Sequence, residues 1–143
     1  MKKWILPALC ILVFASCKKQ APAPVRMTTK TLTFEVYAET DYSSLTPDVQ
    51  SDVALLIKKR NAVNSTITIL FDSTMPFRPL IQYPQLSQKM VVQKQVSVEV
   101  NNDVIEMVVS VRYFTPGGGY AANRLFNAEC RPGESQKVLA VRL

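Results

Sequence analysis

Apolar and polar residues alternate along most of the chain after residue 30, which is the pattern of half-buried β-strands. The alternation is clear in segments 31–39, 66–72, 90–100 and 104–114. The residues that share one face in these segments are, in chain order, Leu32, Phe34, Val36 and Ala38; Ile67, Ile69 and Phe71; Met90, Val92, Val96, Val98 and Val100; and Ile105, Met107, Val109, Val111 and Tyr113.

Turn residues at two places in the chain predict β-hairpins. Asn101-Asn102-Asp103 follows segment 90–100, and residues of these types tolerate positive φ, so the sequence predicts a hairpin with segment 104–114. Arg131-Pro132-Gly133-Glu134 has proline and glycine where a type II turn requires them. It predicts a second hairpin, between segments 124–130 and 136–143.

Segment 45–60 fits two structures. Thr46-Pro47-Asp48 is a good helix start, and Val49, Val53, Leu56 and Ile57 would share a helical face. The same residues also predict a strand, followed by a polar turn and segment 66–72. We favour the strand, because short strands at regular spacing suit a sandwich. The expected fold is an all-β, antiparallel β-sandwich of about six or seven strands, immunoglobulin-like or transthyretin-like, with a short helix within 46–60 as the alternative.

The first seventeen residues have a different composition. Lys2 and Lys3 precede eleven residues without a charge, which is too short for a membrane-spanning helix of roughly 20 residues and fits the apolar region of a secretory signal. Small residues and Cys17 come next.

Phe14-Ala15-Ser16-Cys17 resembles the lipobox of bacterial lipoproteins, although the family most often has leucine where this chain has Phe14. The resemblance implies cleavage before Cys17 and a diacylglycerol on its sulfur, which anchors the protein in a membrane. Lys18 after the cysteine is the pattern that implies the outer membrane in this family, and the inner membrane remains the alternative, with either face compatible. The alternative is an ordinary secretory signal with an incidental cysteine.

These features divide the chain into a signal peptide (1–16), a lipidated cysteine with a flexible tether (17–30) and a β-sandwich domain (31–143). The chain carries a formal charge of +6. From Thr31 onward, however, eleven basic residues face eleven acidic ones. A nucleic-acid-binding domain carries a basic face, so nucleic acid is not expected as a partner.

The chain lacks the residues of common catalytic and metal sites. It contains no histidine, which excludes Ser-His-Asp and Cys-His arrangements. Cys10 lies in the signal, so Cys130 is the only thiol left beside the lipidated Cys17, too few for a thiolate zinc site. Cys130 alternates with Phe126 and Ala128 and is expected to face the core, where a thiol is inert. We expect no metal, no cofactor and no enzymatic activity.

Two stretches are candidates for contact with a partner. Segment 75–86 contains three prolines with Phe77, Arg78 and Tyr83, and Tyr120 lies at the tip of loop 116–123. Tyrosine and arginine commonly anchor interfaces. In the alternative, segment 75–86 is a crossover that packs its aromatic residues on the core.

The expected function is that of a membrane-anchored cell-envelope lipoprotein acting as a non-enzymatic binding or assembly module. It would dock another envelope protein through loops or an edge strand. The alternatives are a ligand- or polysaccharide-binding lipoprotein and, with least support, a hydrolase that works without histidine.

The lipobox resemblance predicts the behaviour of Cys17→Ala. Without the thiol, the chain should lose its lipid anchor and either leave the membrane fraction or remain uncleaved, because two or three acyl chains provide the stable attachment. Fractionation of cells with mass determination of the N-terminus measures both properties. Membrane retention with normal cleavage would contradict the resemblance.

Overall fold

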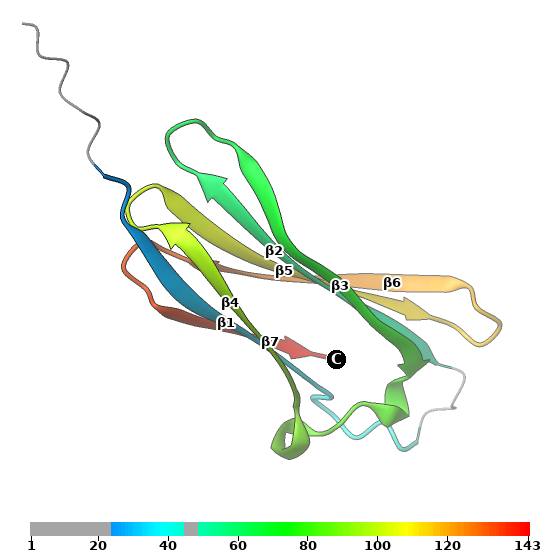
Figure 1. Ribbon diagram of the computed structural model, residues 1–143. Coiled ribbons are helices and arrows are strands. Elements are labelled where there is room, and N and C mark those ends of the chain that lie inside the picture. The colour runs from blue at the N-terminus through cyan, green and yellow to red at the C-terminus, as the bar shows by residue number, and fades with distance from the viewer. Residues whose placement is uncertain (1–23, 45–48) are drawn as a thin grey trace, which may run out of the picture.

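The computed structural model describes residues 24–44 and 49–143, which form a sandwich of seven strands (Figure 1). The strands are β1 (Met27–Tyr37), β2 (Gln50–Asn61), β3 (Ile67–Pro79), β4 (Met90–Glu99), β5 (Asp103–Phe114), β6 (Tyr120–Cys130) and β7 (Gln136–Arg142). Two short 3-10 turns, η2 (Leu80–Gln82) and η3 (Leu86–Gln88), connect β3 to β4. The expected all-β sandwich is confirmed. No helix in this part of the chain is long and apolar enough to cross a membrane, and the lipobox lies outside it.

The two sheets have three and four strands, in the orders β4-β1-β7 and β3-β2-β5-β6. β1 is the central strand of the smaller sheet, antiparallel to β4 and parallel to β7. The β1–β7 pair thus departs from the antiparallel pairing expected throughout. β1 begins at Met27, so residues 27–30 belong to the sheet and not to the tether in which the sequence placed them.

The core lies between the sheets and contains the faces that the alternation predicted for β1, β4 and β5. Leu32, Phe34 and Val36 on the inner face of β1 are fully buried and belong to one apolar cluster with the inner face of β5. The fully buried apolar residues of these two strands are Leu32, Phe34, Val36, Ile105, Met107, Val109 and Val111.

Segment 50–60 is a strand, which is the alternative that the sequence favoured. The predicted helix start at 46–48 lies outside the described residues. Val53, Leu55 and Ile57 of β2 are buried at a period of two. The helical alternative would have placed Leu56 on the buried side. In the strand Leu56 points to the outer face, because it is one residue out of phase with Leu55 and Ile57.

Both predicted hairpins are wrong. β4 pairs with β1 while β5 pairs with β2 and β6, and β6 and β7 belong to different sheets. Turns 100–102 and 131–135 therefore carry the chain across the core from one sheet to the other. The true hairpins of the larger sheet are β2–β3 and β5–β6.

The local turn geometry was predicted correctly in one case of the two. Gly133 has φ +91° and the Glu134 N–H donates to the Arg131 carbonyl (3.1 Å), as in a type II turn. Asn101 and Asn102, in contrast, adopt negative φ, since Ser65 is the one non-glycine residue of the described chain with positive φ. The neighbouring Asp103 carboxylate instead accepts the Glu99 N–H (2.8 Å).

A β-bulge in β3 separates residues that the alternation placed together. Ile69 pairs with Lys58 and Phe71 pairs with the adjacent Ile57, so Leu70 is an extra residue. Phe71 packs on the core, while Ile67 and Ile69 point outward and are about three-fifths exposed (61% and 60%). The extra residue of a bulge switches the face of the sheet to which the following side chains point. A prediction from strict alternation does not include such a switch.

Replacement of Phe34 should test the core. Phe34→Ala removes a fully buried ring and should lower the free energy of unfolding by roughly 3–5 kcal/mol. Phe77→Ala, at a half-exposed ring, should cost about 1 kcal/mol or less. Urea denaturation of the purified full-length chains measures both values, and equal losses would contradict this placement of the core.

Candidate functional site

Three aromatic side chains from three strands meet at one end of the larger sheet. The ring centroids of Phe77 (β3) and Phe114 (β5) are 4.9 Å apart, and those of Phe114 and Tyr120 (β6) are 6.3 Å apart. Both contacts are edge-to-face, with interplanar angles of 72° and 82°. Phe77 is 50% and Tyr120 62% exposed. We call these three residues the aromatic surface.

Strand register brings the aromatic surface together. Phe114 follows the inward-facing Tyr113 and so points to the outer face, where it lies opposite Gln50 of β2 and Tyr120 of β6. Phe77 joins them through a second bulge of β3, since Arg78 pairs with Ser51 whereas Met75 pairs with Val53. Bulges at sheet edges commonly redirect a side chain in this way.

A small hollow of about 110 Å³ lies beside these rings. Its walls are formed by Gln50, Phe77, Phe114, Thr115, Gly117 and Gly118. Gly117 and Gly118 have φ values of +93° and +85°, and the Thr115 N–H donates to the Gly119 carbonyl (2.8 Å), so the triglycine stretch is an ordered turn. Small-molecule sites typically measure roughly 300–1,000 Å³. This hollow therefore fits a single side chain better than a whole ligand.

The charges next to the aromatic surface cancel. Arg112 lies one row from Phe114 on the outer face and forms a two-pronged hydrogen-bonded pair with Asp52, whose Oδ1 is 2.9 Å from Nε. The hydrogen bond and charge of Asp52 raise the pKa of the Arg112 guanidinium. Arg112 and Asp52 thus neutralise each other beside the hollow, and in the part of the chain that the structure describes this pairing favours an uncharged partner group.

The other two residues predicted for the interface pack inward. Tyr83 is 4% exposed, its hydroxyl donates to the Ser51 carbonyl (3.5 Å), and burial raises the pKa of that hydroxyl. The Arg78 guanidinium lies 5.4 Å from the Tyr83 ring centroid and donates to Met90 Sδ (3.6 Å). These two side chains follow the crossover alternative, whereas Phe77 and Tyr120 reach the surface.

Phe114 was missed by the sequence analysis. The signal was present, because Phe114 ends a strand at the phase opposite to Ile105, Met107 and Val109. An aromatic residue on the outer phase of a strand is a candidate contact. Its contacts with Phe77 and Tyr120, however, could be known only from the register of β3 and β6.

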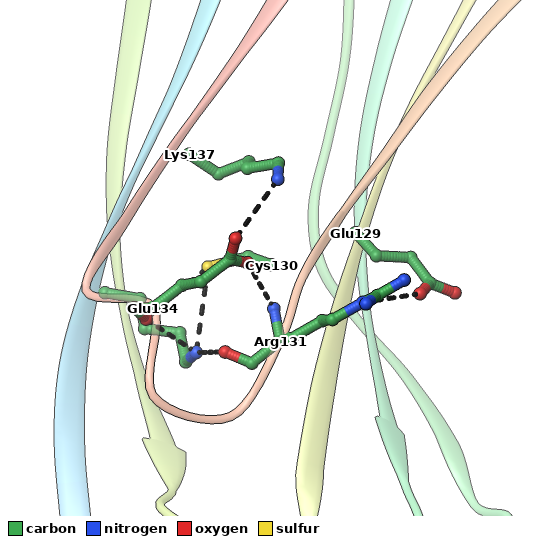
Figure 2. Close-up of polar contacts among 6 residues, drawn as sticks. Glu129, Cys130, Arg131, Glu134 and Lys137 are labelled. Atoms are coloured by element: carbon green, nitrogen blue, oxygen red, sulfur yellow. Dashed lines mark hydrogen bonds and ion pairs between the residues drawn. The ribbon is translucent and has the colours of Figure 1, made fainter.

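A second cluster surrounds Cys130 at the turn between β6 and β7 (Figure 2). Cys130 is fully buried, as its alternation with Phe126 and Ala128 predicted. Lys30 of β1 is only 1% exposed, and its Nζ donates to the carbonyls of Arg131 and Glu134 (2.8 Å to the latter) and to Cys130 Sγ (3.6 Å). Three acceptors therefore satisfy all three donors of the ammonium.

The Glu134 carboxylate completes this cluster from the surface. It accepts the Arg131 N–H (2.6 Å) and pairs with Lys137 (3.3 Å), and these two interactions lower the pKa of the Glu134 carboxyl. The cluster ties the turn to β1. We assign it a structural role, since each of its polar groups is occupied by another group of the turn.

A larger hollow, of about 350 Å³, lies at the opposite end of the sandwich, between residues 24–26 and 99–102. It contains the oppositely charged Arg26 and Glu99 and no aromatic side chain. Over residues 24–44 and 49–143, no group of three or more His, Cys, Asp or Glu side chains is placed to hold a metal ion. No protein-family model, curated protein or solved structure matches this chain.

The buried ammonium of Lys30 leads to a stability prediction. Lys30→Met removes the charged hydrogen bonds that two carbonyls receive from the ammonium and should lower the free energy of unfolding by about 1.5–3 kcal/mol. Lys137→Met, which breaks only a surface pair of Glu134, should cost about 1 kcal/mol or less. Thermal and urea unfolding compare the two variants, and a larger loss in Lys137→Met would contradict the assigned role of Lys30.

Proposed function

We propose that this protein is a membrane-anchored cell-envelope lipoprotein that acts as a non-enzymatic binding or assembly module. In this proposal the aromatic surface docks another envelope protein. The observation that carries the proposal is the grouping of Phe77, Phe114 and Tyr120 on the outer face of the sheet, next to a hollow that Phe77 and Phe114 help to line. Aromatic residues are enriched where protein interfaces bury their central contacts.

The size of the hollow favours a protein partner over a small ligand. About 110 Å³ suits one apolar side chain of a partner, in the manner of an anchor residue filling a pocket. The ring angles of 72° and 82° also disfavour a polysaccharide, because neighbouring rings at near right angles do not form one flat stacking platform. A ligand-binding role would use the hollow of about 350 Å³ at the other end instead.

The direction of the chain supports the same proposal. The proposed tether enters at the start of β1, and Met27 pairs with Glu99 at the end of the sandwich that also contains turn 100–102. The aromatic surface lies at the opposite end, where β5 ends and β6 begins (Figure 1). Eleven residues of β1 extend about 35 Å, at ~3.3 Å per residue. A lipid anchor at Cys17 would thus hold the aromatic surface away from the membrane.

Two substitutions test the aromatic surface. In cells that express the tagged full-length chain, chemical cross-linking followed by purification and mass spectrometry should recover one or two envelope proteins in stoichiometric amounts. Phe77→Ser and Tyr120→Ser should each reduce this recovery at least about tenfold, the effect of losing a hot-spot residue.

The matched control is Val138→Ser, at an exposed apolar residue of β7 in the other sheet. It should leave recovery unchanged. Recovery that persists in both aromatic variants, at normal protein levels, would refute the assigned surface. Absence of any envelope protein above background would refute the assembly role and direct attention to glycans and small molecules.

A further inference from the structure

The first half of β6 is uncovered on both faces. All six residues from Tyr120 to Leu125 are exposed, and within the described chain β6 pairs on one side only, with β5. Figure 1 shows why: β6 and the β5–β6 loop extend past the end of β7, so that the smaller sheet does not cover them. The outer edge of β6 therefore presents backbone groups that can pair with another strand.

The opposite side of the sandwich is protected against such pairing. β3 has two bulges and carries Pro76 and Pro79. On β4, Lys94 points inward, and its Nζ lies 4.5 Å from the ring centroid of Phe71 in the other sheet. Bulges, prolines and inward-pointing charges are the usual means by which natural edge strands avoid pairing.

The outer half of β6 lacks these protective features and carries a large apolar side chain in the middle of its free edge. Leu125 is 71% exposed, and the eleven residues of β6 include no proline and no lysine. The one inward-pointing charge is Arg124, which stacks over Phe126 of the same strand (5.4 Å to the ring centroid). It lies where the opposite sheet is absent, so pairing at this edge would not bury it in the core.

The sequence of β6 is nearly symmetric about Leu125. Residues 122–128 read Ala-Asn-Arg-Leu-Phe-Asn-Ala, and only the third and fifth positions differ on reversal. If two copies of β6 pair antiparallel about a two-fold axis at Leu125, the residues that face each other are Leu125 and Leu125, Asn123 and Asn127, Ala122 and Ala128, and Arg124 and Phe126. Each pair is chemically compatible, because apolar meets apolar, amide meets amide, and a guanidinium meets an aromatic ring.

We propose that two copies of this chain associate through β6 in this register, which joins their four-stranded sheets into one of eight strands. The proposal is independent of the envelope role and of the aromatic surface. Both members of the Arg124–Phe126 pair lie on the inner face of β6, opposite Val111 and Val109 of β5. The guanidinium can therefore exchange the ring of its own chain for that of the second copy without changing sides.

The interface is small. Each copy contributes seven residues, whereas a standard stable complex uses roughly 20–30 residues on each side. The two Arg124 side chains carry the same charge and would lie diagonally across the axis, about 7–8 Å apart. The dimer should exchange with monomers at low concentration. Covalent trapping is accordingly the suitable measurement.

Cysteine trapping reads out the register directly. Leu125→Cys places two thiols opposite each other, with Cβ atoms about 4.5–5.5 Å apart, close to the span of a disulfide. The purified full-length chain in mild detergent is oxidised with copper-phenanthroline and run on a non-reducing gel. Leu125→Cys should form covalent dimer at least about tenfold faster than Ile67→Cys, because pairing gives the two thiols a high effective concentration.

Ile67 is the matched control, since it is comparably exposed (61%) on the protected edge β3. The unsubstituted chain gives the background from its own cysteines. Asn123→Cys and Asn127→Cys should each trap little dimer alone, whereas a mixture of the two variants should trap it. Equal rates for Leu125→Cys and Ile67→Cys would overturn the dimer, and efficient trapping by Asn123→Cys alone would overturn this register.

Discussion

The burial of the inner face of β1 is the constraint on which the rest of the structure depends. This strand lies between β4 and β7 in the smaller sheet, and Leu32, Phe34 and Val36 lie at the centre of the core. The same strand supplies Lys30, whose buried ammonium binds the carbonyls of the turn between β6 and β7. β1 therefore sets both the packing of the two sheets and the point at which the chain returns to the smaller one.

The surfaces available for binding arise where this packing ends. The two sheets differ in size, and β5 and β6 extend beyond the strands that would cover them (Figure 1). At that end the outer face carries the aromatic surface, and the free edge of β6 carries Leu125. The two features are separate, since one uses side chains of the outer face and the other uses backbone groups at the edge. If both proposals hold, a single molecule would be able to engage a partner protein and a second copy at the same time.

Two pairs of polar side chains resemble the reactive groups of enzymes, and the contacts of both pairs stabilise the fold. Cys130 and Lys30 are adjacent and almost completely buried, but the turn carbonyls satisfy the ammonium. Arg112 and Asp52 pair with each other on the outer face. These contacts join distant parts of the chain, 100 residues apart for Lys30 and Cys130 and 60 for Arg112 and Asp52. Their role in the described residues is to hold strands and turns in register.

The sequence by itself determined which residues face the core in β1, β4 and β5, because a strand that is half buried must alternate with period two. It also determined the type II turn at Pro132-Gly133, whose φ values those residues favour, and the inward position of Cys130. Only the tertiary structure decided which strands are neighbours. An apolar face is buried equally well whether the next strand lies in the same sheet or in the opposite one, so alternation could not distinguish a hairpin from a crossing between sheets. The bulges of β3 were hidden for a related reason, since their positions depend on pairing with β2. They turned Ile67 and Ile69 outward and placed Phe77 beside Phe114, and so the candidate site itself was decided by register.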